Sequence, residues 1–141
     1  MQQIILGSIF LLICSVFHVF VLGLCVPLLV KVGHRVSALN FPVKMVALVL
    51  TALAAIVGSH TVQVWLWALY WVQSGAMQDW NTAVYFSTVT YTTLGYGDVV
   101  LNEDLRIFGS FASVTGLLAF GISTAFLVGL IARLLPDTLD T

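Results

Sequence analysis

Charged side chains are scarce in this chain of 141 residues. Only 8% of the residues are charged, five basic and six acidic, whereas 60% are hydrophobic. A soluble domain has about 25% charged residues, and so few charges cannot solvate the surface of a small globule. This shortage argues against a soluble enzyme and against a nucleic-acid-binding protein. Proline is also rare, with three residues beside eleven glycines, which argues against a low-complexity chain.

Cysteine is nearly absent as well. Cys14 and Cys25 are the only two, and they fall eleven positions apart in one apolar run. On one helix they lie about three turns apart and cannot form a disulfide with each other. We therefore favour small apolar side chains in a packed helix over redox or metal chemistry.

Four stretches carry no charge: 1–30, 45–78, 80–97 and 107–132. Three of them are long and apolar enough for the roughly 20 residues that cross a bilayer as a helix. The first lacks a positively charged start and exceeds the apolar core of about 7–15 residues in a signal peptide, so we expect it to be retained. The sequence predicts an all-α membrane protein with three membrane-spanning helices at 1–30, 43–73 and 105–135.

The basic residues predict the orientation of these helices in the membrane. Three of the five lie in or beside the link 31–42, and Arg133 lies at the end of the third helix. Both places should be cytoplasmic, which puts the amino terminus outside and the tail 136–141 inside. A fourth crossing at 80–97 would move Arg133 to the opposite side, so we predict a re-entrant segment there.

Four aromatic residues gather at the end of the second predicted helix: Trp65, Trp67, Tyr70 and Trp71. Trp and Tyr are enriched where a bilayer meets water. The cluster is therefore typical of an interfacial belt.

The segment Thr93–Asp98 reads T-L-G-Y-G-D and follows a stretch rich in Ser and Thr. It resembles the selectivity-filter signature of tetrameric potassium channels, T-V-G-Y-G-D, and residues 85–92 resemble the pore helix before it. The resemblance spans about 45–133, so the chain resembles a small prokaryotic-type member with an extra N-terminal helix. It implies a homotetramer and a pore domain at 43–135, with the outer helix at 43–73, the pore helix at 80–92, the filter at 93–97 and the inner helix at 105–135.

The composition of this filter suits cation binding by the backbone. Gly95 and Gly97 alternate with Leu94 and Tyr96, and glycine easily reaches the left-handed conformations that such a segment needs. The resemblance implies that the carbonyls of Thr93, Leu94, Gly95 and Tyr96 replace the water shell of K⁺, with Gly97 completing the filter. One strand offers oxygens on one side only, so several copies must surround an ion.

The resemblance assigns further roles around the filter. Asp98 lies at the outer mouth, where we expect a hydrogen bond from Tyr85, and Val89 stands where some members have a carboxylate partner for that aspartate. On the inner helix the resemblance places a hinge at Gly116 and cavity-facing residues at Leu117, Phe120, Gly121 and Thr124. Glycines here also fit small-residue packing between membrane helices, and both roles stay open.

Three polar side chains fall inside the predicted spans: His18, His60 and Gln63. Polar groups at this depth are functional candidates. Two interpretations stay open, a pH-sensitive contact between helices or neutral histidines in interhelical hydrogen bonds, and we favour the second. A metal site would need more ligands than the sequence offers there.

Together these patterns predict a potassium-selective channel that conducts K⁺ passively as a homotetramer in a lipid bilayer, and not an enzyme. Two alternatives remain, a weakly selective cation channel of the same architecture and a non-conducting membrane assembly subunit. We expect no cofactor, with K⁺ as the permeant ion, and neither a nucleic acid nor a small-molecule substrate as partner. By analogy, the expected location is a bacterial inner membrane. No pattern in the sequence indicates a gating stimulus.

Overall fold

A computed structural model describes residues 1–135, which form four α-helices. In chain order these are α1 (Gln2–Arg35), α2 (Phe41–Gln73), α3 (Trp80–Tyr91) and α4 (Glu103–Leu134). The all-α prediction is confirmed for this part of the chain, and α1, α2 and α4 are each long and apolar enough to cross a membrane. The predicted tail at 136–141 lies outside the described residues.

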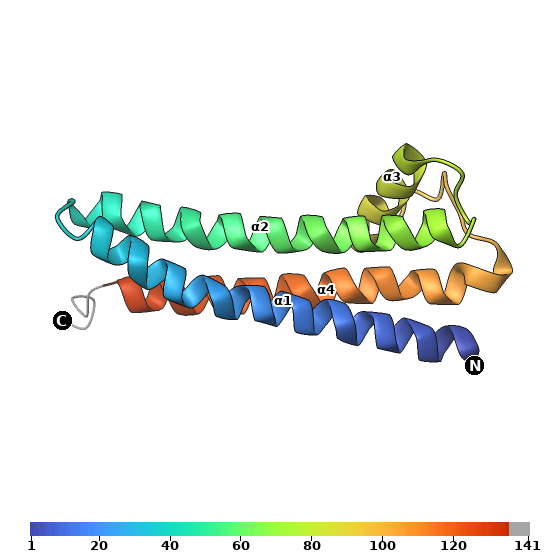
Figure 1. Cartoon of the computed structure of the whole chain (residues 1–141), viewed down its shortest axis with the longest axis horizontal. Helices are drawn as coiled ribbons and strands as arrows, with labels where there is room; N and C mark the ends of the chain where they lie inside the picture. The colour runs from blue at the N-terminus through green and yellow to red at the C-terminus, as the bar shows by residue number, and fades with distance from the viewer. Residues whose placement is uncertain (136–141) are drawn as a thin grey trace.

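The three long helices run side by side, and the short helix α3 lies beside the end of α2 (Figure 1). The amino terminus is at this same end, whereas the link between α1 and α2 and the end of α4 lie at the opposite one (Figure 1). The outward face of α1 is apolar, since Leu12, Val16 and Phe20 are 64%, 60% and 62% exposed. Such a surface suits contact with lipid.

The helix ends differ from their predicted positions by up to five residues. α1 continues through Arg35, which shortens the link predicted at 31–42 to five residues. His34 and Arg35 occupy its last turn, where positive charge favours the helix dipole. α4 begins at Glu103 rather than at residue 105, and its first turn holds the acidic residues Glu103 and Asp104, which favour a helix start for the same reason.

The aromatic cluster at the end of α2 is mostly core, so the interfacial-belt prediction is wrong for two of its members. Trp67 and Trp71 are fully buried, whereas Trp65 is 51% exposed. Phe10 of α1 packs on Trp67 with ring centroids 4.5 Å apart, and Phe108 of α4 lies 5.3 Å from the same ring. Helices on both sides of α2 therefore cover the surface that would otherwise face the membrane boundary.

The start of α3 is fixed by its own cap and by this aromatic core. Asp79 adopts an extended conformation, and its Oδ1 accepts a hydrogen bond from Thr82 N–H at 2.9 Å. The bonds from Thr82 lower the pKa of Asp79, which keeps its carboxylate charged at the helix N-terminus. Phe86 then packs edge-on against Trp71 at 5.6 Å. Cap and core together orient α3 relative to α2.

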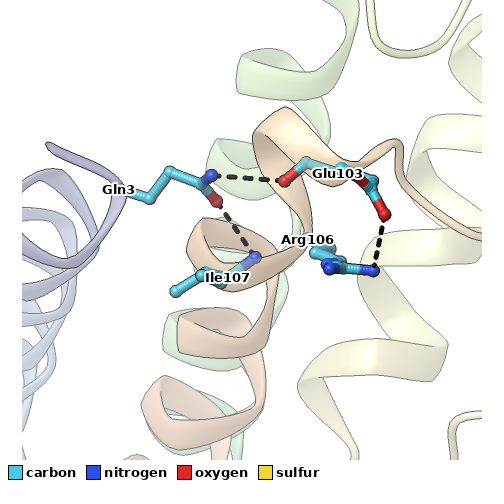
Figure 2. A network of polar contacts seen from close by, with 4 residues as sticks. All are labelled: Gln3, Glu103, Arg106 and Ile107. Atoms are coloured by element: carbon cyan, nitrogen blue, oxygen red, sulfur yellow. Dashed lines mark hydrogen bonds and ion pairs between the residues drawn. The ribbon is translucent and has the colours of Figure 1, made fainter. Parts of the chain in front are cut away.

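Gln3 ties the amino-terminal end of α1 to the first turn of α4 (Figure 2). Its Nε2 donates to the Glu103 carbonyl at 3.3 Å, and its Oε1 accepts from Ile107 N–H at 3.1 Å. In a regular helix those two backbone groups also bond each other, so the Gln3 amide shares a carbonyl and an N–H with the first turn of α4. Nearby, Arg106 forms an exposed ion pair with Glu103 at 3.3 Å.

Candidate functional site

The last turn of α3 lies deep inside the bundle. The Tyr91 hydroxyl is 2.9 Å from Nδ1 of His60, and the Tyr91 carbonyl lies against Gly116. His60 is thirteen residues before Gln73, the end of α2, and Gly116 is thirteen residues after the start of α4. At 1.5 Å per residue, both contacts are about 20 Å from the ends of these helices.

Helix α4 is locked to this last turn by close packing and by a hydrogen bond. A Cβ atom placed on Gly116 would come within 1.8 Å of the Tyr91 carbonyl oxygen, so only glycine fits there. One turn earlier, Ser113 Oγ donates to the Thr90 carbonyl at 2.9 Å. The depth of the α3 end is therefore set by α4.

The segment after α3, residues 93–97, is the filter segment, and its backbone is unusual. Gly95 and Gly97 have φ angles of 55° and 78°, as the sequence led us to expect of glycines. Thr93 also has a positive φ, of 61°, which the sequence did not suggest. For a residue with a side chain this conformation costs about 1–2 kcal/mol, so the surrounding contacts must hold Thr93 in place.

The amides of the filter segment point back at α3. Leu94 N–H and Gly95 N–H both donate to the Val89 carbonyl, at N···O distances of 3.0 and 3.2 Å. Residues 1–135 contain no cis peptide bond, and in a planar trans peptide the C=O points opposite to the N–H. The carbonyls of Thr93 and Leu94 therefore turn away from α3, toward the open side of the segment.

That open side is not covered by the chain itself. Every residue from 92 to 98 is exposed, and the large side chains Leu94 and Tyr96 are 54% and 66% exposed. The chain itself leaves more than half of each of these two side chains uncovered. The open side of the segment is therefore accessible to water or to another molecule.

At the outer end of the filter segment, Tyr85 and Asp98 interact as the sequence predicted. The Tyr85 hydroxyl donates to Oδ2 of Asp98 at 2.6 Å. This bond lowers the pKa of Asp98 below its ordinary value and keeps its negative charge at the mouth. Val89, which stands in place of a second carboxylate, is 8% exposed and offers no competing partner.

A family described as Ion channel matches residues 45–133, which is more than half of the sequence. The chain belongs to this ion channel family. No curated protein and no solved structure matches it. The three apolar helices agree with the family in placing the protein in a membrane, and an ion channel is not an enzyme. The match begins after α1, so α1 is an addition to the part of the channel that the family defines.

The residues predicted for the channel's inner cavity divide into two groups. Leu117 is 60% exposed, Thr124 is exposed, and Gly121 has open space where a Cβ would stand. Gly116, by contrast, is packed tightly on Tyr91. Phe120 is 39% exposed, and its ring also packs on the His60 ring with the centroids 4.6 Å apart.

The three polar residues singled out within the spans lie together in one network, made of His18, Ser59, His60, Gln63, Tyr91 and Ser123. All except His60 are at most 5% exposed. Sequence reasoning had not included Ser123 or Tyr91, since a lone serine or tyrosine in a membrane helix carries no pattern. Within residues 1–135 no group of three His, Cys, Asp or Glu side chains is placed to hold a metal.

Proposed function

We propose that this ion channel is selective for potassium and conducts K⁺ passively through a filter of backbone carbonyls. The observation that carries the proposal is the direction of the filter peptides. Their amides are used by α3, and the carbonyls of Thr93 and Leu94 face the open side. Carbonyl oxygens on such a strand can replace the hydration shell of a monovalent cation without any charged ligand.

We further propose that the channel is a homotetramer. One copy leaves residues 92 to 98 exposed, including the apolar Leu94 and the ring of Tyr96. The same chain has a hollow of about 500 Å³ between the filter segment and α4, lined by Phe86, Val99 and Ser110 among others. Four copies around an axis would surround the ion, and side chains of one copy would fill the hollow of the next.

The position of α3 supports a re-entrant pore helix. It starts beside the outer end of α2 and its last residue lies about 20 Å inside the bundle. Its C-terminal end carries partial negative charge, and four such ends aimed at a common cavity would stabilise a dehydrated cation there. The exposed face of α4 around Leu117, Gly121 and Thr124 would line that cavity.

The charge distribution supports an amino terminus outside and a carboxyl end in the cytoplasm, and the inner membrane of a bacterium is proposed by analogy alone. Lys31 and Arg35 belong to the end of α1, Lys44 to the start of α2 and Arg133 to the end of α4. These helix ends lie at the end of the bundle away from α3 (Figure 1). Positive residues favour the cytoplasmic side. The filter segment and its carboxylate Asp98 then lie toward the outside, where negative charge concentrates cations.

The decisive experiment is cation flux into liposomes that contain the purified full-length protein. We expect uptake of rubidium that barium blocks, little uptake of sodium, and a tetramer by native mass measurement. Equal sodium and rubidium fluxes would favour the weakly selective channel, and absence of any flux would favour the non-conducting assembly subunit. Either result would overturn potassium selectivity.

A further inference from the structure

We propose that helix α1 is a positioning element of the channel, acting through a buried chain of hydrogen bonds from His18 to Tyr91 at the base of the filter. This inference goes beyond the proposed function and rests on it only in using cation currents as one readout. α1 lies outside the part of the chain that matches the channel family, so its contacts with the pore need a separate explanation.

The first part of the chain joins α1 to α4 and α2. His18 of α1 places Nε2 2.9 Å from Ser123 Oγ of α4, and the same hydroxyl is 3.2 Å from Nε2 of His60 on α2. His18 is fully buried and Ser123 is 5% exposed. One serine hydroxyl therefore connects two imidazoles from two other helices, near the middle of the bundle.

The second part joins His60 to the pore helix. Its Nδ1 is 2.9 Å from the Tyr91 hydroxyl, and Tyr91 is the last residue of α3. The same residue packs its carbonyl on Gly116, and the filter segment begins two residues later at Thr93. A shift of the Tyr91 side chain would thus move the end of α3 and the strained Thr93 that follows it.

The chain needs its two imidazoles to be matched in protonation. A neutral imidazole donates from one nitrogen and accepts at the other, and the single proton of Ser123 serves one of the two Nε2 atoms that face it. When His18 donates from Nε2 to Ser123, His60 accepts at Nε2 and donates from Nδ1 to the Tyr91 hydroxyl. When Tyr91 donates to Nδ1 of His60, the order is reversed and His18 donates from Nδ1 to Ser59. In both orders one ring carries its proton on Nε2 and the other on Nδ1.

Three neighbouring rings pack on His60 and restrict its position. The His60 ring lies between His18 at 5.0 Å and Phe120 at 4.6 Å, with Tyr91 at 5.9 Å, measured between ring centroids. His18 is held from its other side by Ser59 Oγ at 2.8 Å. In a low-dielectric interior a broken link leaves a polar group unpaired, which is costly, so the links favour one position of Tyr91.

The test compares single-channel currents of the full-length protein in planar bilayers. The variants Ser123→Ala and Tyr91→Phe each remove one hydroxyl and little volume, and His18→Leu removes the first imidazole. We expect each to lower the open probability about three- to tenfold, the equivalent of one net hydrogen bond. His18→Gln can still donate to Ser123 and should restore most of the activity.

Two control variants separate positioning from general packing. Cys25→Ala removes buried volume two turns from His18, where Cys25 packs in a cluster with Leu29, Leu48 and Ala52, and His34→Gln changes an exposed histidine of the same helix. Both should conduct like the wild type. The double variant Ser123→Ala/Tyr91→Phe should lose no more than either single variant, because both break the same chain.

Several outcomes would overturn this inference. They are wild-type open probability in Ser123→Ala or His18→Leu, additive losses in the double variant, and losses in Cys25→Ala as large as those in Ser123→Ala. Should Ser123→Ala fail to assemble, nitrogen chemical shifts of labelled histidines in the wild-type protein decide. They must show two neutral rings protonated at opposite nitrogens, Nε2 of one histidine and Nδ1 of the other, and protonation of both rings at the same kind of nitrogen contradicts the chain. Wild-type selectivity tests the proposed function separately.

Discussion

Two polar regions of this channel meet at the end of α3. They differ in whether their polar groups find hydrogen-bond partners within one chain. In the network around His18 and His60, the hydroxyls and imidazoles bond one another inside one copy, and Gln63 Oε1 is left without a partner there. The filter segment is open, since all of residues 92 to 98 are exposed and the carbonyls of Thr93 and Leu94 turn outward. A group that is satisfied within the chain can hold a position, whereas a group left unsatisfied is available to a ligand or to another copy.

The comparison also locates the boundary between the two regions. Tyr91 belongs to both, because its hydroxyl ends the network and its carbonyl lies on Gly116 just before the filter segment. Changes at this boundary should affect both regions. Changes elsewhere in the network should reach the filter segment only through Tyr91.

The largest effect is expected at the boundary itself, from Gly116→Ala. The new Cβ would lie 1.8 Å from the Tyr91 carbonyl oxygen, which is backbone and cannot rotate away. Separating α3 from α4 to relieve this overlap should cost about 3 kcal/mol of stability and abolish conduction. Thermal unfolding of the purified protein in detergent, together with rubidium uptake, measures both losses.

Gly121→Ala is the matched control for that change. It lies on the same helix and has nothing within 4 Å of the added Cβ. We expect its stability to stay within about 0.5 kcal/mol of the wild type or to rise, because alanine favours the helix. Equal destabilisation by both substitutions would mean that Gly116 is not a packing site.

The second prediction concerns the open region alone. Gly95→Ala places a side chain at a φ of 55°, which costs about 1–2 kcal/mol of backbone strain, and nothing within 4 Å blocks it. The peptide should rotate to relieve the strain and turn a filter carbonyl out of line. We expect the preference for K⁺ over Na⁺, measured as the reversal potential under bi-ionic conditions, to be lost.

Gly75→Ala tests whether backbone strain at a glycine is enough to remove selectivity, or whether the strain must lie in the filter segment. Gly75 has a φ of 70° with open space around its Cβ position, but it lies in the loop between α2 and α3. This substitution should cost a similar amount of stability and leave ion selectivity unchanged. Loss of selectivity in both variants would remove the reason to assign selectivity to Gly95.

Much of this arrangement could be predicted from sequence because it depends on local rules. Charge-free runs gave the long helices, and the T-L-G-Y-G-D run pointed to the filter segment with its two left-handed glycines. The bond from Tyr85 to Asp98 was also expected and is confirmed. Each of these features is set by residues close together in the chain or by the demands of the bilayer.

The remainder depends on how helices meet, which local patterns do not encode. Trp67 and Trp71 resembled a membrane-boundary belt, yet Phe10 of α1 and Phe108 of α4 cover them. Ser123 entered the network only because two histidines from other helices reach it. The positive φ of Thr93 follows from the way its neighbours bond back to α3, and threonine gives no sign of it.

The third prediction compares the buried contacts that α1 makes through His18 with the exposed contact that it makes through Gln3. Gln3→Ala removes the amide that bonds Glu103 and Ile107, but those two backbone groups still have each other as partners in the regular helical pattern. We expect a loss of about 1 kcal/mol or less, seen as a small drop in the unfolding temperature and unchanged open probability. Gln2→Ala, at the exposed neighbouring position, should change neither the unfolding temperature nor the open probability. A fall in open probability for Gln3→Ala would show that α1 also acts on the pore through its amino-terminal end.

The smallest effect is expected at the outer mouth, and it depends on pH. The Tyr85 bond lowers the pKa of Asp98 below the ordinary value of about 3.9, so the charge at the mouth persists below that pH and is lost as pH falls through the lowered pKa. Tyr85→Phe should raise this pKa, so that single-channel conductance begins to decline at a higher external pH than in the wild type. Asp98→Asn should give the reduced conductance at every pH, and identical titrations of wild type and Tyr85→Phe would show that the bond does not control the charge of the mouth. Asp98 is exposed and already charged at neutral pH. Neither variant should therefore lose as much stability at neutral pH as Gly116→Ala does. The effects at the mouth and at the packed boundary around Tyr91 can thus be told apart.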